Sequence, residues 1–297
     1  MQSEIRSIEE ESRQVKAVGM KKQGEYTRWE KARARKVTWN ELWKMDGHKI
    51  SFLLRSVYDV LPSPTNLRLW GLTEDPNCKL CNKPANLEHV LSSCRTALTD
   101  GRYTWRHNHV LKEVAATLDI ARRKKTTIQK GPTFIDFVRG GKGASSKKHE
   151  LGILATANDW EMQADLVQKS TFPREIIITN LRPDIVLWSR STRQVILVEL
   201  TIPWETRLEE AHEIKLAKYL QLIEDIQQKK WKAWNFPIEI GCRGFASQTL
   251  WRAMRFLGII GPTRKSLIAN AGKRAEEASC WLWRKREEQW TCQSVLG

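Results

Sequence analysis

The sequence has no apolar run that approaches the roughly 20 residues a membrane-spanning helix needs, although the chain is 297 residues long. Its first residues, MQSEIRSIEEESRQVK, are also too charged for the apolar part of a signal peptide. We therefore expect no membrane as a partner. We also expect an intracellular, reducing location, in which the six cysteines are not structural disulfides.

Acidic residues are in short supply. The chain has 34 Asp and Glu against 50 Lys and Arg, which gives a formal net charge of +16 and a pI near 9.7. This excess favours a polyanionic partner, with nucleic acid ahead of an anionic membrane. The alternative is a soluble basic protein without such a partner. Residues 101–150 alone hold 12 basic and 4 acidic side chains, a net charge of +8.

The hydrophobic content of 41% and the 14 tryptophans argue against overall disorder. We divide the chain into four parts. Residues 1–36 are a charged tail or frayed helix, and residues 37–129 are mostly helical. The Gly-, Ser- and Lys-rich residues 130–150 are a flexible basic linker. In residues 151–297, strand and helix patterns alternate, which predicts an α/β unit with a mixed sheet.

Hydrophobic spacing predicts the individual elements. In residues 37–62 we expect two helices separated near Gly47, with Trp39 and Trp43 in the core. Another helix is expected over residues 102–125, with a partial apolar stripe at Val110, Val114, Leu118 and Ile120. The last unit should contain a helix over 149–170, strands at EIIITNLRPD, IVLW, VILVELT and FPIEIGC, and helices over 204–230, 247–259 and 270–291.

The segment CKLCNKPANLEHVLSSC, residues 78–94, carries a metal-binding pattern. Cys78, Cys81, His89 and Cys94 supply three thiolates and one imidazole. Zn²⁺ takes four such ligands tetrahedrally, and closed Cys₃His sites are structural rather than catalytic. The pattern predicts a structural zinc knuckle; the alternative is a set of unrelated reduced cysteines and a surface histidine. His107 and His109 fall outside the spacing, and we expect them to face solvent or phosphate.

Small zinc knuckles are frequent in proteins that bind single-stranded nucleic acid. The basic residues that follow this one are predicted to bind nucleic acid: Arg102, Arg106, Arg122, Arg123, Lys124 and Lys125. Tyr103 and Trp105 lie among them. These two aromatic side chains either stack on bases or pack under the zinc site.

Two carboxylates interrupt the apolar strands. Asp184 stands directly before IVLW, and Glu199 lies within VILVELT. An acid in an apolar strand is costly unless something satisfies or uses it. The short connection SRSTRQ brings the start of one strand beside the end of the next. The two acids could then share Mg²⁺ or Mn²⁺, which would activate water for attack on a phosphodiester.

The helix over 204–230 offers a cation to this pair. A helical wheel puts Lys215 in the middle of its apolar stripe, and Lys218 lies roughly 60° away. A lysine on a buried stripe needs a partner, and Glu199 is the obvious one. In the alternative, Lys215 extends its ammonium group to water. Glu161 or Asp165 is a candidate for a further carboxylate.

RPD and VELT, followed by a helix with KxxKY, resemble the PD-(D/E)xK nuclease superfamily with a displaced lysine, because Thr201 stands where that motif usually has its lysine. The knuckle upstream resembles the one that precedes this nuclease in LINE-type (non-LTR) retrotransposon proteins. GRYTWRHNHVL, LTIPWE, AKY and GCRGFA strengthen the resemblance, which covers roughly residues 37–290.

The resemblance implies a restriction-endonuclease-like domain at 151–297 that nicks target DNA. It implies that Asp184 and Glu199 bind the metal, and that Lys215 or Lys218 with Tyr219 completes the site. DNA and RNA are the expected partners, and the nucleus is the expected location. The chain has no YxDD-type polymerase motif, so we expect no polymerisation, and a separate reverse transcriptase domain is a further candidate partner.

Two functions therefore compete. In the first, the chain is a Mg²⁺-dependent DNA endonuclease. In the second, it is a catalytically inactive, zinc-containing DNA- or RNA-binding module derived from such an element, since fold alone does not establish function. The observation that separates them is whether Asp184 and Glu199 face a common open cleft or are locked in structural ion pairs.

Overall fold

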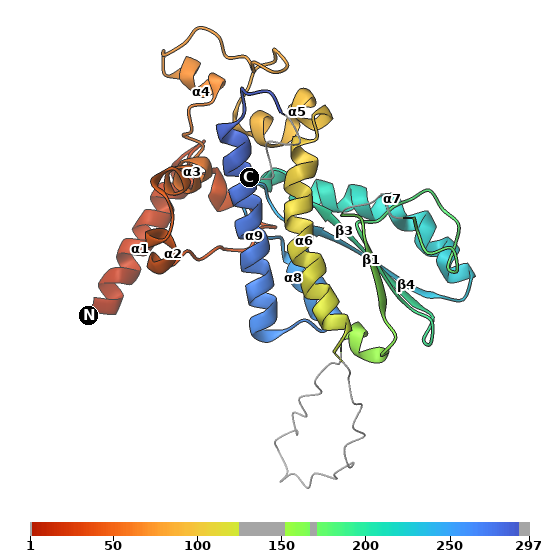
Figure 1. The fold of residues 1–297 in the computed structure, drawn as a ribbon. Helices are drawn as coiled ribbons and strands as arrows, with labels where there is room; N and C mark the ends of the chain where they lie inside the picture. Colours follow the sequence, from red (N-terminus) through yellow and green to blue (C-terminus); the bar gives the residue numbers. More distant parts are fainter. Residues whose placement is uncertain (1, 125–151, 167–170, 291–297) are drawn as a thin grey trace.

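The computed structural model describes residues 2–124, 152–166 and 171–290 (Figure 1). A helical N-terminal part carries the Cys/His cluster, and a four-stranded mixed sheet flanked by helices follows. The predicted mixed α/β class is confirmed. The expected linker 130–150 lies outside the described residues. Within the described ranges, none of the helices combines the length and the apolar character needed to cross a membrane.

The sheet has the order β1-β2-β3-β4. The strands β1 (Glu161–Ala164), β2 (Ile185–Ser189) and β3 (Gln194–Thr201) are antiparallel neighbours, and β4 (Lys232–Glu239) runs parallel to β3. A parallel neighbour needs a crossover, and α7 (Leu208–Gln228) supplies it. In the β2–β3 register Ile185 pairs with Val198. Asp184 is therefore directly opposite Glu199.

Helices cover both faces of the sheet. On one face Val186, Val195 and Leu197 pack against Tyr219 and Leu222 of α7. The other face packs into a larger core with α6 (Arg102–Arg122), α8 (Gln248–Leu257) and α9 (Gly261–Arg284). The long helices α6 and α9 lie side by side in Figure 1. The same core continues beneath the Cys/His cluster, so the cluster and the sheet share one hydrophobic interior.

The remaining elements are short or lie at the N-terminus: α1 (Gln2–Gly19), η1 (Glu25–Arg28), α2 (Trp39–Trp43), α3 (Gly47–Val57), α4 (Pro64–Leu69), η2 (His89–Ser93), α5 (Arg95–Thr99), η3 (Ile153–Thr156) and η4 (Glu205–Arg207). The helix α1 buries no side chain, as expected for a charged N-terminal segment. Trp29 is buried, however, so the end of the expected 1–36 tail belongs to the core.

Two expected elements are wrong. Residues 149–170 do not form a helix: η3 and β1 occupy the described part. Between them Asp159 accepts hydrogen bonds from Ser189 and Ser191, which fixes an extended chain beside the β2–β3 turn. EIIITNLRPD is a turn and loop rather than a strand. Its Glu175 accepts hydrogen bonds from the Trp188 indole and from Arg190. Side-chain hydrogen bonds, instead of backbone pairing with a neighbouring strand, therefore hold this segment in place.

The expected core positions of Trp39 and Trp43 are also wrong, because the two side chains are 77% and 82% exposed. They belong to α2, a five-residue helix whose N-terminus is capped by a capping box between Thr38 and Glu41. The capping box satisfies backbone N–H groups at the start of this short helix, so the helix forms without burying an apolar face. Ile120 is exposed as well, whereas Val110, Val114 and Leu118 are buried as predicted.

Candidate zinc centre and acid cleft

Four potential ligands gather at one point in the helical part. The ligand atoms of Cys78, Cys81, His89 and Cys94 all lie within 4.8 Å of one another. The Sγ atoms of Cys78 and Cys94 are 3.9 Å apart, and Cys81 Sγ is 3.2 Å from His89 Nε2. A tetrahedral zinc with Zn–S near 2.3 Å and Zn–N near 2.0 Å separates its ligands by about 3.5–3.8 Å. These residues therefore fit Zn²⁺.

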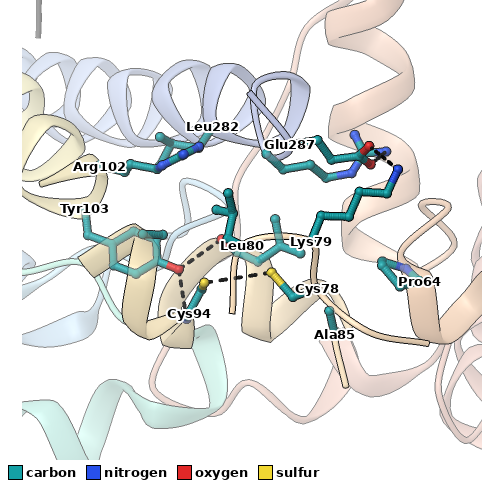
Figure 2. A pocket seen from close by; sticks show the side chains of 13 residues that line it. Pro64, Cys78, Lys79, Leu80, Ala85, Cys94, Arg102, Tyr103, Leu282 and Glu287 are labelled. Atoms are coloured by element: carbon teal, nitrogen blue, oxygen red, sulfur yellow. Dashed lines mark hydrogen bonds and ion pairs between the residues drawn. The ribbon is translucent and has the colours of Figure 1, made fainter. Parts of the chain in front are cut away.

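Local structure sets these ligands in place. The turn after Cys81 uses Asn82 at φ 54°, a left-handed conformation that asparagine tolerates. Tyr103 lies beside Cys94 of the cluster (Figure 2). Its hydroxyl accepts a hydrogen bond from the Cys94 N–H and donates towards the carbonyls of His89 and Val90. Tyr103 thus packs under the zinc site instead of offering a stacking surface.

A comparison with protein families supports this reading of the cluster. Residues 23–99 match the family model described as zinc-binding in reverse transcriptase. The match spans 77 of the 297 residues and contains all four ligands. It supports a retrotransposon-derived protein and a zinc-containing nucleic-acid-binding module. No curated protein matches the chain.

The zinc site gives a first prediction. Purified chain should carry about one zinc per molecule, and Cys94→Ser should lose most of it, because the side chain no longer supplies a thiolate. Zinc content measured by plasma mass spectrometry checks this. Cys280→Ala is the matched control, since Cys280 is equally a buried free cysteine but lies outside the cluster. Equal zinc in both variants would contradict the assignment.

Two of the arginines predicted to contact nucleic acid are buried inside the protein. Arg102 and Arg106 are each only 2% exposed. Arg102 donates to the carbonyls of Lys285 and Glu288, and Arg106 donates to Ser279 Oγ and the Ile202 carbonyl. These guanidinium groups join α6 to α9 and the sheet, so the prediction that they bind phosphate is wrong.

The other predicted contacts differ in exposure. Arg122 donates to the Trp160 carbonyl and pairs with Asp119. Arg123 and Lys124 are exposed, and Lys125 lies outside the described residues. Trp105 packs against His109 and Trp290, with ring centroids 4.7 and 5.6 Å away. Trp105 therefore packs against other side chains, but these are not the zinc ligands that the second option named.

The second feature is the acid pair at the end of the sheet. Glu199 continues the row of Val195 and Leu197 that faces α7, because alternate strand residues share a face. Its Oε1 accepts from Lys215 Nζ at 2.6 Å and from Lys218 Nζ at 3.3 Å. Its Oε2 accepts from the Tyr219 hydroxyl at 2.9 Å and from the Asp184 N–H at 3.2 Å. The other four residues predicted for this site therefore all contact Glu199.

A cleft of about 660 Å³ opens beside the pair. Asp184 and Lys215 line it, together with Asp165, and Tyr103 and His107 of α6 also contribute to the lining. Glu199 is not in the lining and is only 3% exposed. Glu161, the other candidate carboxylate, pairs with Arg190 outside the cleft. One acid therefore faces the open cleft, whereas the other is held in ion pairs.

His107 was not expected here. Its Nε2 lies 3.1 Å from Asp184 Oδ2 and 3.2 Å from the Leu200 carbonyl oxygen, so it can donate to both. Burial alone would lower the pKa of His107, but the hydrogen bond and charge of Asp184 outweigh it and raise the pKa above its ordinary value. One signal could have found it: His107 follows Tyr103 by four residues and so shares its helix face.

The acid pair meets only part of the requirement for a divalent cation. Carboxylate oxygens are the ligands that Mg²⁺ prefers, and Asp184 presents one to the cleft. Both Glu199 oxygens already accept hydrogen bonds, so Lys215 must move before Glu199 can bind a cation. Among the described residues, Cys78, Cys81, His89 and Cys94 form the only group of three or more potential metal ligands.

Proposed function

We propose that this chain is a zinc-containing, nucleic-acid-binding module of a retrotransposon-derived protein that nicks DNA in a Mg²⁺- or Mn²⁺-dependent reaction. The observation that carries the proposal is that Asp184 and Lys215, which line the cleft, both contact the buried Glu199 behind them. Acids in apolar strands are expensive to keep, and here they stand beside a lysine at an opening large enough for a phosphodiester.

Each residue has a distinct role in this proposal. Asp184 and Glu199 would hold the cation, which supplies an activated water when bound. Lys215 lines the cleft and would neutralise charge on the phosphate. Lys218 and Tyr219 orient Glu199. Burial and the negative charge of Glu199 raise the pKa of Tyr219, so its hydroxyl keeps its proton and donates.

A second candidate function has its own support. The four hydrogen bonds to Glu199 are what a purely structural carboxylate would make. In that case the chain is a catalytically inactive module that binds DNA or RNA. Lys215 would then contact phosphate in the cleft without any cutting.

Nicking of supercoiled plasmid tests between the two. The zinc-loaded chain is incubated with plasmid, with and without added Mg²⁺ or Mn²⁺, and relaxed circles are measured on a gel. Metal-dependent nicking supports the endonuclease. No nicking, combined with salt-sensitive binding of labelled DNA or RNA, supports the inactive module instead.

His107 gives a further prediction. His107→Ala should raise the Mg²⁺ concentration needed for half-maximal nicking by about 10–100-fold, because outer-sphere hydrogen bonds orient metal-binding carboxylates. His107→Gln keeps an N–H donor and should recover most of the loss. Rates are measured across a Mg²⁺ titration. An unchanged Mg²⁺ requirement in His107→Ala would exclude a positioning role.

A further inference from the structure

A cluster of arginines surrounds Trp251 on α8, apart from the residues that line the acid cleft. The guanidinium carbons of Arg33 and Arg264 lie 4.0 and 3.7 Å from the centroid of the Trp251 ring. Both guanidinium groups therefore contact the Trp251 ring. The tryptophan therefore brings the two cations to one place on the surface.

The cluster is electrostatically unfavourable as it stands. Two side-chain nitrogens of Arg264, Nε and Nη1, are buried without a hydrogen-bond partner. Burial lowers the pKa of Arg264, and the nearby cations Arg255 and Arg33 lower it further. Arg264 also lies in the first turn of α9, where the positive end of the helix dipole disfavours a cation. Local rules broken together in this way are characteristic of functional sites.

We propose that Arg33, Arg255 and Arg264 form a binding site for the phosphate backbone of a nucleic acid. Guanidinium groups bind phosphate oxygens through paired N–H donors, and an incoming phosphate would supply negative charge next to the two cations that contact Trp251. Phe256 and Ile260, 52% and 50% exposed, lie next to it in the sequence and offer apolar surface to sugars or bases.

This inference rests on the nucleic-acid-binding part of the proposed function and extends it. The arginines that the sequence favoured for this task, Arg102 and Arg106, are buried. Arg252 and Arg255 are exposed on α8. The surface around Trp251 therefore gives the chain a second place to hold a strand, on a different element from the cleft that Asp184 lines.

The test uses the full zinc-loaded chain and fluorescently labelled DNA, with anisotropy measured over a salt series. The double variant Arg33→Gln/Arg264→Gln should raise Kd by about tenfold or more. The slope of log K against log salt should also become less steep by one to two, because binding releases fewer counterions when phosphate contacts are lost. Arg13→Gln/Lys229→Gln, at two exposed positions on other elements, removes the same charge and is the matched control.

Each outcome is decisive. A loss of affinity confined to the Trp251 cluster variant supports the site. Equal effects in the two double variants would overturn it, because net charge alone would then explain binding. Cluster-specific binding of anionic vesicles with unchanged DNA affinity would overturn it too. If the wild-type chain binds no nucleic acid, the proposed function itself fails, whereas wild-type binding with an unaffected cluster variant overturns this inference alone.

A structural role for Arg264 is tested separately. Because the cations repel one another, Arg264→Gln should leave the thermal midpoint of the free chain unchanged or raise it, and added DNA should stabilise it less than it stabilises the wild type. A fall of more than about 5 °C without DNA, which is larger than most surface substitutions cause, would show that Arg264 serves folding.

Discussion

Asp184→Asn is expected to abolish Mg²⁺-dependent nicking while leaving DNA affinity nearly unchanged. Asparagine has the same shape and can still accept hydrogen bonds from the Leu200 N–H and from His107, which contact Asp184 Oδ2 in the wild type. It does not supply the charged oxygen that a hard cation requires. If the cation contributes about 4 kcal/mol to the transition state, the rate falls about a thousandfold.

Glu161→Gln is the matched control for this substitution. Glu161 is a carboxylate on β1 that lies opposite Trp188, at the far end of β2 from Asp184, and it pairs with Arg190 outside the cleft. Its nicking rate should stay within about twofold of the wild type, as expected for a surface change remote from the site. If Asp184→Asn cuts as fast as Glu161→Gln, the chemistry does not depend on the acid pair.

The same assay decides between the two lysines. Lys215 lies 2.6 Å from Glu199 and lines the cleft, whereas Lys218 lies 3.3 Å from Glu199 and is not in the lining. Lys215→Met should therefore reduce nicking much more than Lys218→Met. The reverse order would assign the phosphate contact to Lys218 and leave Lys215 as the partner that balances the buried charge of Glu199.

The sequence predicted the parts of the site that depend on local spacing. The zinc ligands follow from a short pattern, and Lys215, Lys218 and Tyr219 follow from helical periodicity. The pairing of Asp184 with Glu199 follows from a short turn between two strands. Each of these relations spans few residues, so the chain geometry alone constrains it.

The relations that the sequence missed are long-range. His107 meets Asp184 across 77 residues, and Arg106 meets Ser279 across 173. An arginine on a helix looks solvent-facing until the element packed against it is known. Trp39 and Trp43 show the opposite error: their size and apolar character predict burial, but both side chains are exposed on a short helix that is stabilised by its capping box.

The largest expected effect on stability comes from a buried ion pair outside both sites. Arg243 and Glu205 are 1% and 0% exposed in their side chains. Arg243 Nε donates to Glu205 Oε2 at 2.6 Å, and its backbone N–H donates to Oε1 at 2.7 Å. The guanidinium group stacks between Trp29 and Trp204, at 4.0 and 3.6 Å from the two ring centroids.

Arg243→Ala should therefore lower the free energy of unfolding by about 3–5 kcal/mol, because it leaves the Glu205 carboxylate buried without its counter-charge. That is a large part of the 5–15 kcal/mol typical of a folded domain. Urea denaturation followed by tryptophan fluorescence measures the change. Arg190→Ala, which breaks exposed pairs with Glu175 and Glu161, should leave the free energy of unfolding nearly unchanged, because water screens exposed ion pairs.

The same experiment tests whether the zinc-bearing helices and the sheet unfold together. Arg243 also donates to the Ser56 carbonyl of α3, so one side chain from the loop after β4 contacts both Trp29 and α3 of the N-terminal part. Arg106 likewise joins α6 to Ser279 of α9. Two buried arginines therefore connect the helical N-terminal part to the part that contains the sheet. We expect a single unfolding transition for the wild type, with zinc release coinciding with the loss of tryptophan signal. Zinc release at clearly lower urea would show that the Cys/His part opens independently of the sheet.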